Sequence, residues 1–279
     1  MSIDNFNYIT NQIFPHGLGT RIALLINAIA YSKFENKEFI FTPFSHQNTA
    51  GEFDANPMTR RIDYLEACNR WDTLLNLDGK LITDIPDNEL GTVLALCHTS
   101  IKNSPPQGHE GYLMINKVRG LRGEIRDEFF KIPPKKEDGK LKVSVHIRRD
   151  DIIGMKSRFI GNGYYIETIG LLEEFLIGNN SEYELTIYTQ RNGFDVSGFE
   201  KHKIIYDTDM SDNDVWVNLV NSDIIIASNS AFSTSVGLLT DGVFIHPQVD
   251  NFPLMDDWLY GSELTQDKLI EKLNINKIL

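Results

Sequence analysis

The stretch Leu141–Asp151, LKVSVHIRRDD, is an apolar strand pattern that runs directly into two adjacent arginines. Its β-branched residues stand at alternate positions, which predicts a buried strand over Lys142–Arg148. In an open parallel sheet, ligands bind outside the carboxyl ends of the strands. Arg148 and Arg149 would stand at such an end, and a guanidinium keeps its charge and fits phosphate oxygens with two hydrogen bonds. The stretch therefore predicts an anion-binding site at the edge of a parallel sheet.

Two carboxylates follow the arginines and offer a purely structural explanation. Asp150 or Asp151 could form an ion pair with either guanidinium, and such a pair needs no ligand. This stretch alone leaves both explanations open.

The composition bounds the size and the class of the protein. With 279 residues the chain exceeds the usual length of one domain, which predicts two domains, and 41% hydrophobic residues are enough for full cores. A formal net charge of -12 argues against a nucleic-acid-binding protein, because such proteins carry a basic face. A small anionic ligand in a local basic pocket is compatible with this charge.

Targeting and cysteine patterns predict a soluble, cytoplasmic protein. No apolar run reaches the roughly 18 residues of a membrane span, and the N-terminus lacks a basic region followed by an apolar one. Cys68 and Cys97 form no CxxC pair and lie in apolar surroundings, so we expect buried free thiols rather than a disulfide or a metal site.

The first half of the chain resembles the second part of a βαβ unit. Residues 14–44 read as a glycine-rich loop, a helix and a strand over Glu38–Phe44. We also predict a helix within Arg61–Leu75, a strand over Thr92–Cys97 and a helix over Leu121–Phe130. Residues 132–140, IPPKKEDGK, combine a proline pair, charges and glycine as linkers do, so we place the domain boundary there, with domains 1–136 and 137–279.

Strands and helices alternate after this linker, which predicts an α/β domain with a parallel, doubly wound sheet. The predicted strands are Lys142–Arg148, Tyr183–Thr189, Lys203–Tyr206, Asp223–Ala227 and Val243–His246. The predicted helices are Tyr164–Leu176, Asp214–Val220, Phe232–Thr240 and Thr265–Leu273.

A second anion-binding candidate lies in residues 222–239, SDIIIASNSAFSTSVGLL, a buried strand followed by a helix. Between the two stand side chains suited to a pyrophosphate: Ser228, Asn229, Ser230 and Ser233. Ordinary N-capping explains the same residues, but an arginine pair at the end of another strand of the same sheet favours an anion site. The turn Gly17-Leu18-Gly19 before the first helix is a weaker candidate, since it lacks the spacing of a dinucleotide or P-loop motif.

Other polar residues follow predicted strands at the same edge of the sheet. Thr189, Gln190 and Arg191 could contact a base or a ribose. Asp207-Thr208-Asp209 matches a DxD metal-binding motif, but the acidic residues around it favour a solvated loop with a helix cap. No His or Cys cluster has the spacing of a zinc site, so we predict no metal.

Together these residues resemble the fucosyltransferase superfamily whose members share an HIRRGD-type motif: the alpha-1,2-, alpha-1,6- and protein O-fucosyltransferases. VHIRRDD at 145–151 resembles the central motif, and HGLGTRIALLINAIAYSK at 16–33 resembles the N-terminal loop and helix. GYYIETI at 163–169 and NDVWVNLVNSDIIIASNSAFSTSVGLL at 213–239 resemble later parts of the same domain. Residues 45–139 find no counterpart.

The resemblance implies a GT-B-like architecture, in which two Rossmann-type domains face a cleft and the C-terminal domain holds the nucleotide sugar. Arg148 would bind the donor pyrophosphate and support its departure, with Arg149 acting less directly. Such enzymes invert the anomeric centre and generally need no metal or other cofactor. The resemblance also places these residues near the donor: Gly17, Gly19, Ser230, Phe232 and Ser233.

We therefore predict a glycosyltransferase that moves a sugar from a nucleotide sugar to a glycan hydroxyl. GDP-fucose is the family default, but Asp150 stands where glycine is usual and Arg21 where a neutral amide is usual, which leaves UDP-xylose or another UDP-sugar open. As general base, His16 and Asp72 rank above Asp54, although each also suits a structural role. The alternative is a non-catalytic nucleotide- or glycan-binding module.

Overall fold

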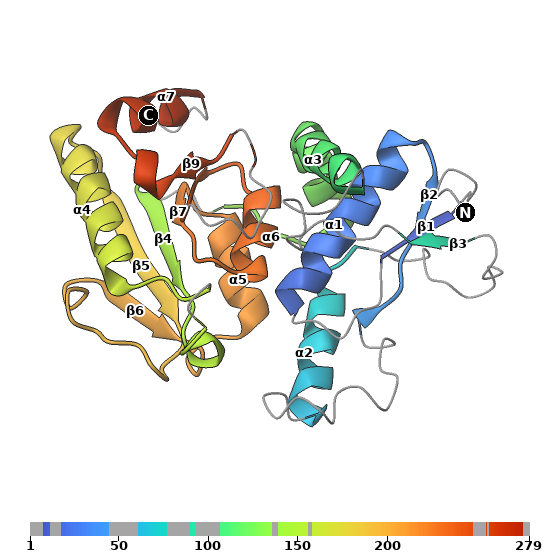
Figure 1. The fold of residues 1–279 in the computed structure, drawn as a ribbon, viewed down its shortest axis with the longest axis horizontal. Helices are drawn as coiled ribbons and strands as arrows, with labels where there is room; N and C mark the ends of the chain where they lie inside the picture. The colour runs from blue at the N-terminus through green and yellow to red at the C-terminus, as the bar shows by residue number, and fades with distance from the viewer. Residues whose placement is uncertain are drawn as a thin grey trace. The chain divides into compact units, whose positions relative to one another are not determined.

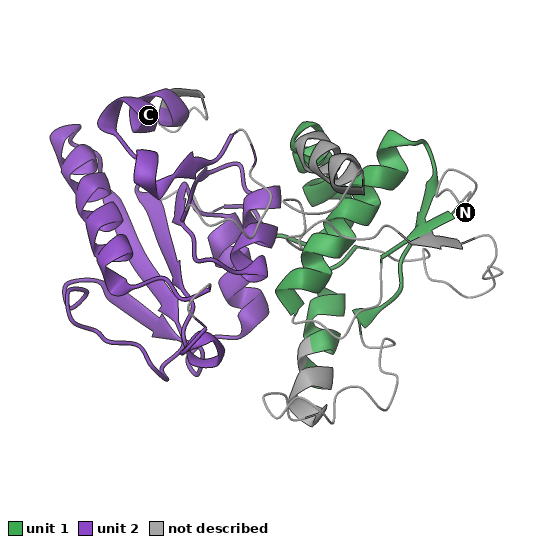
Figure 2. Cartoon of the chain, viewed as in Figure 1, with its two compact units in different colours: residues 1–132, 251–253 green, residues 133–250, 254–279 purple. Residues whose placement is uncertain are grey.

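The computed structural model describes residues 8–11, 18–44, 61–76, 90–92, 107–135, 139–155, 158–247, 255 and 257–275. The chain divides into two compact units (Figure 2), residues 1–132 with 251–253, and residues 133–250 with 254–279. The first unit ends at the proline pair of the predicted linker. That the two units act as acceptor and donor sides of a cleft stays a prediction.

Unit 1 contains a three-stranded parallel sheet in the order β2-β1-β3. Its elements are β1 (Tyr8–Thr10), α1 (Leu18–Phe34), β2 (Glu38–Ile40), α2 (Arg61–Thr73), β3 (Leu90–Thr92) and α3 (Gln107–Phe129). Helix α1 is buried along most of its length and packs against α3. Cys68 is buried, as predicted, whereas Cys97 lies outside the described residues.

Two predictions for unit 1 differ from the structure, and a third lies mostly outside the described residues. The predicted strand Glu38–Phe44 is shorter, because β2 ends at Ile40. Helix α3 begins at Gln107, well before the predicted start at Leu121. Of the predicted strand Thr92–Cys97, only Thr92 is described, as the last residue of β3.

Unit 2 alternates strands and helices as the sequence predicts. Its elements are β4 (Leu141–Ile147), the 3₁₀ turn η4 (Asp150–Ile152), α4 (Asn162–Gly178), β5 (Tyr183–Thr189), β6 (Lys203–Tyr206), α5 (Asp212–Val220), β7 (Ile224–Ile226), α6 (Ala231–Leu239), β8 (Val243–His246), β9 (Leu259–Tyr260), the 3₁₀ turn η5 (Gly261–Glu263) and α7 (Gln266–Ile275). Strands β5, β6 and β8 have the predicted bounds, and only β9 was not predicted.

The six strands of unit 2 form one sheet in the order β6-β5-β4-β7-β8-β9, and every neighbouring pair is parallel. Numbered from β4 along the chain, this is the order 3-2-1-4-5-6 of a Rossmann sheet. The strand order reverses between β4 and β7, where α4 lies on one side of the sheet and α5 and α6 on the other (Figure 1). Ligands of such sheets bind at the carboxyl ends of the strands beside this switch point.

Alternation along β4 gives the two faces of the sheet different chemistry. Val145 belongs to an apolar core that includes Leu172 of α4 and Leu269 of α7. His146, the next residue, points to the opposite face, where its ring contacts Ser233 of α6. Hence the face toward α4 is apolar, and the face toward α5 and α6 carries buried polar groups.

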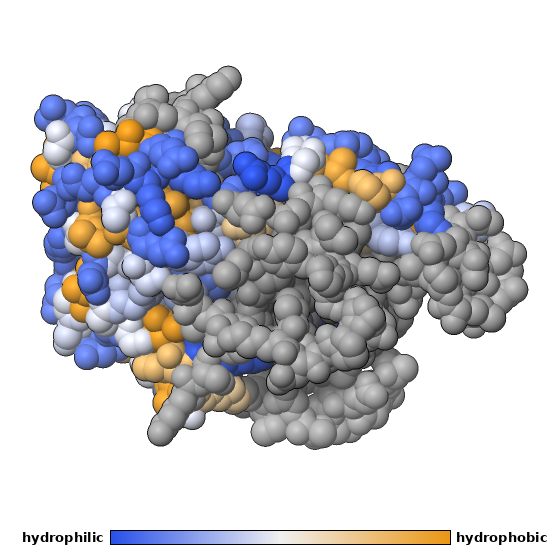
Figure 3. Space-filling model, turned by 45° about the horizontal axis from the view of Figure 1, so that its top comes forward, coloured by the Kyte–Doolittle hydropathy of each residue, from blue (hydrophilic) through white to orange (hydrophobic). Residues whose placement is uncertain are grey.

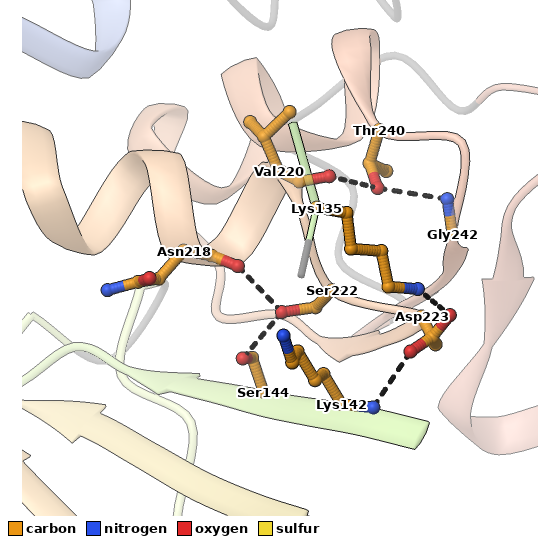
Figure 4. A network of polar contacts seen from close by, with 9 residues as sticks. All are labelled: Lys135, Lys142, Ser144, Asn218, Val220, Ser222, Asp223, Thr240 and Gly242. Carbon is orange, nitrogen blue, oxygen red and sulfur yellow. Dashed lines mark hydrogen bonds and ion pairs between the residues drawn. The ribbon is translucent and has the colours of Figure 1, made fainter. Parts of the chain in front are cut away.

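A polar network ties together the amino ends of the two strands at the switch point (Figure 4). The carboxylate of Asp223, which precedes β7, accepts the backbone N–H of Lys142 in β4 at 2.8 Å and forms an ion pair with Lys135 of the linker. Ser222 Oγ lies 2.7 Å from Ser144 Oγ. This network fixes β4 against β7 at the end of the strands remote from Arg148.

Asp223→Ala should lower the free energy of unfolding by about 2 kcal/mol, because it removes the acceptor of a backbone N–H and the partner of Lys135. Glu184→Ala is the matched control. It breaks an ion pair with Lys203 in which both side chains are more than half exposed, and should cost less than about 1 kcal/mol. Chemical denaturation measures both, and equal losses would contradict a structural role for the Asp223 network.

On the face of the molecule that Figure 3 shows, apolar residues appear as separate areas among hydrophilic ones. Scattered exposed apolar residues of this kind are normal for a folded domain. Within the part of the chain that the structure describes, no helix is both long enough and apolar enough to cross a membrane.

Candidate functional site

A pocket of about 220 Å³ lies at the carboxyl ends of β4, β5 and β6. The first turns of α5 and α6 complete its wall through Asp212 and Phe232. This volume is below the roughly 300 to 1,000 Å³ of sites that enclose a whole ligand, so the pocket has room for only part of a ligand of that size. The strands supply these lining residues: His146, Tyr188, Thr189, Ile205 and Tyr206. Arg148, Gln190 and Asp207 line the pocket directly after β4, β5 and β6.

Arg148 lines the pocket and is held by a carboxylate at the same time. Its Nε donates to Asp151 Oδ1 at 3.0 Å, and a terminal nitrogen donates to the other oxygen of that carboxylate. The ion pair that the sequence left open is therefore present. It uses two of the five guanidinium N–H groups, so Asp151 orients Arg148 and leaves three donors for a ligand.

Asp150 does not pair with Arg149. It adopts a left-handed conformation with φ of 50°, which explains why glycine suits this position. Its carboxylate accepts from the Asn192 side chain, and its backbone N–H donates to Asn192 O at 3.2 Å. Gln190 Oε1 accepts the backbone N–H of Arg149 at 2.6 Å. The loop after β5 thus holds the loop after β4 in place through these hydrogen bonds.

The side chain of Arg149 is buried, and it is not among the residues that line the pocket. Its guanidinium lies 4.8 Å from the ring centre of Phe159 and 5.7 Å from that of Tyr165. It donates to Asn162 Oδ1 and, at 2.8 Å, to the backbone oxygen of Arg148. Burial lowers the pKa of Arg149. These contacts attach the loop after β4, which contains Arg149, to the start of α4.

Arg149→Ala should therefore lower stability by about 2 to 4 kcal/mol, because it empties a buried site and removes the partner of Asn162. Arg191→Ala is the control for stability, since Arg191 is 63% exposed and its ion pair with Asp209 spans 3.8 Å. It should change stability by less than about 0.5 kcal/mol. A stable Arg149→Ala protein that has lost nucleotide binding would instead support the direct donor contact predicted from the sequence.

The serines after β7 are buried and bonded to one another. Ser230 caps α6, because its Oγ accepts the backbone N–H of Ser233 at 3.1 Å. Ser228 Oγ and Ser233 Oγ lie 3.1 and 2.7 Å from Nδ1 of His146. Asn229 is also buried. The capping role of Ser230, which the sequence left as an alternative, is thus present, and the serines reach β4 through His146.

The loops after β5 and β6 hold the remaining candidates. Thr189 and Gln190 line the pocket, whereas Arg191 is not among the lining residues and stacks on Tyr206 at 4.2 Å. Asp207 Oδ1 accepts the backbone N–H of Arg191, and Asp209 Oδ2 accepts that of Tyr206. Both carboxylates of the DxD segment therefore accept hydrogen bonds from backbone N–H groups, one in the loop after β5 and one at the end of β6. Among the described residues, no group of three or more His, Cys, Asp or Glu side chains is placed to hold a metal ion.

The candidates from the N-terminal half lie in unit 1 or outside the described residues. Gly19 is buried within α1 rather than in the turn before it, and His16, Gly17 and Asp54 are not described. Asp72 Oδ1 accepts the backbone N–H of Phe44 at 2.9 Å, which gives this carboxylate a structural contact.

Sequence reasoning missed His146 and Tyr188 as lining residues. The alternation of side chains along a strand could have identified His146, because His146 stands two residues before Arg148 and therefore shares its face of the sheet. No local pattern identifies Tyr188, which pairs with His146 only through the register of β4 and β5.

No family model and no curated protein matches this sequence. Among solved structures, the chain is similar to the NodZ alpha-1,6-fucosyltransferase co-crystallized with GDP, with 12% identity and a TM-score of 0.36 over 85% of this chain and 93% of that one. It is similar to the E. coli heptosyltransferase WaaC with ADP, with 11% identity and a TM-score of 0.34 over 98% and 73%. For POFUT1 in complex with GDP-fucose, the identity is 10% and the TM-score 0.31 over 93% and 74%. These similarities to glycosyltransferases are distant.

Proposed function

We propose that this protein is an inverting glycosyltransferase that moves a sugar from a nucleotide-sugar donor to a hydroxyl of a glycan acceptor without a metal ion. The observation that carries the proposal is the position of Arg148 in a pocket at the carboxyl end of β4, beside the switch point of a Rossmann sheet. Nucleotides bind at this place in doubly wound sheets. The resemblance of VHIRRDD to the HIRRGD-type motif supports the same function.

The proposed reaction is a direct displacement at the anomeric carbon. The acceptor oxygen forms a bond to this carbon while the bond to the diphosphate oxygen breaks, and the hydroxyl proton passes to a general base. Arg148 stabilises the negative charge that develops on the diphosphate, in the place that a divalent cation takes in other enzymes. The first turn of α6 adds the positive end of its dipole at Phe232.

The pocket favours a nucleotide as the bound part of the donor. Tyr188 and Tyr206 offer aromatic surface, and Thr189, Gln190 and Asp207 offer hydrogen-bonding groups for a base or a ribose. Arg148 stands at the β4 side of this wall, where the phosphates would then lie. GDP-fucose is the first donor to test and UDP-xylose the second.

The test is a thermal-shift panel of GDP, UDP, GDP-fucose and UDP-xylose with EDTA present throughout. A ligand at about one hundred times its Kd stabilises the folded protein by about 2.7 kcal/mol, so we expect one nucleotide class to raise the melting temperature. The absence of a shift with every nucleotide would reject the proposal. Slow release of free sugar from the stabilising donor, without an acceptor, would distinguish an enzyme from a non-catalytic binding module.

A further inference from the structure

Two serines, Ser228 and Ser233, contact one nitrogen of His146 in the wall of the pocket, and Ser230 hydrogen-bonds to both of them. His146 Nδ1 lies 2.7 Å from Ser233 Oγ and 3.1 Å from Ser228 Oγ. The side chains are buried, with exposed fractions of 6% for His146 and no more than 2% for Ser228, Ser230 and Ser233. Among the described residues, every hydrogen bond of this imidazole involves Nδ1. The other nitrogen, Nε2, is therefore left for the pocket that His146 lines.

Two hydrogen bonds between the serines lead from Ser228 through Ser230 to Ser233, and Ser228 Oγ also lies 3.1 Å from Ser233 Oγ. Ser228 Oγ donates to Ser230 Oγ at 3.1 Å, and Ser230 Oγ donates to Ser233 Oγ at 3.3 Å. The backbone N–H of Ser228 also donates to Ser233 Oγ, at 3.2 Å. Because a hydroxyl oxygen has two lone pairs, these two donors fill the accepting capacity of Ser233.

The hydrogen of Ser233 then decides where the imidazole carries its proton. Its nearest acceptor is Nδ1 of His146 at 2.7 Å, and a nitrogen that accepts a hydrogen bond carries no proton. Burial, and secondarily the charge of Arg148, lower the pKa of His146 to about 3, so the ring is neutral near pH 7. A neutral imidazole has one N–H, which leaves the proton on Nε2.

We propose that Ser233, held by Ser228 and Ser230, fixes the proton of His146 on Nε2, and that this N–H donates to an anionic oxygen of the ligand beside Arg148. In this assignment His146 is a binding residue and the three serines are positioning residues, instead of the donor contacts predicted from the sequence. The identity of the anion as a diphosphate rests on the proposed function, whereas the position of the proton does not.

The position of the proton can be measured in the ligand-free protein by NMR with ¹⁵N-labelled histidine. His146 is assigned as the signal that disappears in His146→Gln. We expect a protonated Nε2 and an unprotonated Nδ1. A proton on Nδ1 would overturn the proposal, whatever the protein binds.

Ser233→Ala tests the positioning role. It should shift the proton toward Nδ1, which can then donate to Ser228 Oγ. Ser235→Ala is the matched control: it makes the same change on α6, where Ser235 Oγ accepts from Trp216 Nε1 at 2.9 Å, and should leave the His146 signals unchanged. An unchanged tautomer in Ser233→Ala would show that the serines do not position this ring.

The donor role is tested by two substitutions that reach different nitrogens. In His146→Gln, the amide N–H of glutamine lies near the former position of Nε2. In His146→Asn, the amide N–H of asparagine lies near the former position of Nδ1. Calorimetry with pyrophosphate, GDP and UDP should show at most about a threefold loss of affinity for the glutamine variant and about tenfold or more for the asparagine variant. Equal losses would refute donation from Nε2.

Pyrophosphate separates this inference from the proposed function. If pyrophosphate binds with the expected difference between the variants but no nucleotide does, the glycosyltransferase proposal fails and the donor role of His146 stands. If neither pyrophosphate nor any nucleotide binds the wild-type protein, the donor role of His146 is rejected as well.

Discussion

Arg148→Ala should abolish the nucleotide-dependent rise in melting temperature and lower the rate of sugar transfer by about a hundred- to a thousandfold. The loss follows from the position of Arg148 in the pocket wall, where it is the one Arg or Lys among the described lining residues and keeps three N–H groups for a diphosphate. The variant should still fold, because its ion pair with Asp151 is partly exposed and contributes about 1 kcal/mol or less. Thermal shift and donor turnover measure the two effects separately.

Two further variants serve as controls for the Arg148→Ala experiment. Arg148→Lys keeps the positive charge but loses the two-pronged contact, so it should retain part of the affinity. Lys203→Ala removes an exposed cation at the amino end of β6 and should leave nucleotide binding unchanged. Retention of full nucleotide affinity by Arg148→Ala would exclude Arg148 as the phosphate-binding residue.

Gly242→Ala should destabilise the protein by about 3 kcal/mol. A Cβ atom on Gly242 would lie 2.3 Å from the backbone oxygen of Ser222 and 2.8 Å from that of Asp223. These are backbone atoms of the network that fixes β7 against β4 and β8, so they cannot move aside without disturbing the sheet. The midpoint of thermal unfolding should fall by several degrees.

Gly170→Ala makes the same chemical change with the opposite expected sign. Gly170 lies within α4, where an added Cβ meets no atom within 4 Å. Alanine in a helix interior is more stable than glycine by about 0.5 to 1 kcal/mol, so the midpoint should rise slightly. A fall in both variants, or in neither, would contradict the steric explanation for Gly242.

The predictions from the sequence were most accurate where local patterns are strong. The bounds of β5, β6 and β8 agree because each strand is a short apolar or β-branched run between turn residues. The early part of α3 was missed because Gly108 and Gly111 weaken the helical signal there, and α3 packs against α1. Strands β1 and β9 are too short for periodicity to identify.

The two arginines show the limit of local reasoning. The sequence placed both of them at the end of a strand, and the structure agrees. Adjacent residues point in different directions, and only packing decides what each one meets. Arg148 lines the pocket, whereas Arg149 is enclosed by Phe159, Tyr165 and Asn162.

By itself the sequence determined the alternation of strands and helices in unit 2 and the presence of arginines after its first strand, because propensity, periodicity and turn chemistry act over a few residues. The order of the strands was decided only by the tertiary structure. That order brings β7 next to β4 and places Ser233 at 2.7 Å from His146, 87 positions earlier in the chain. Contacts over such a separation depend on which strands pair, and no local pattern of residues encodes that choice.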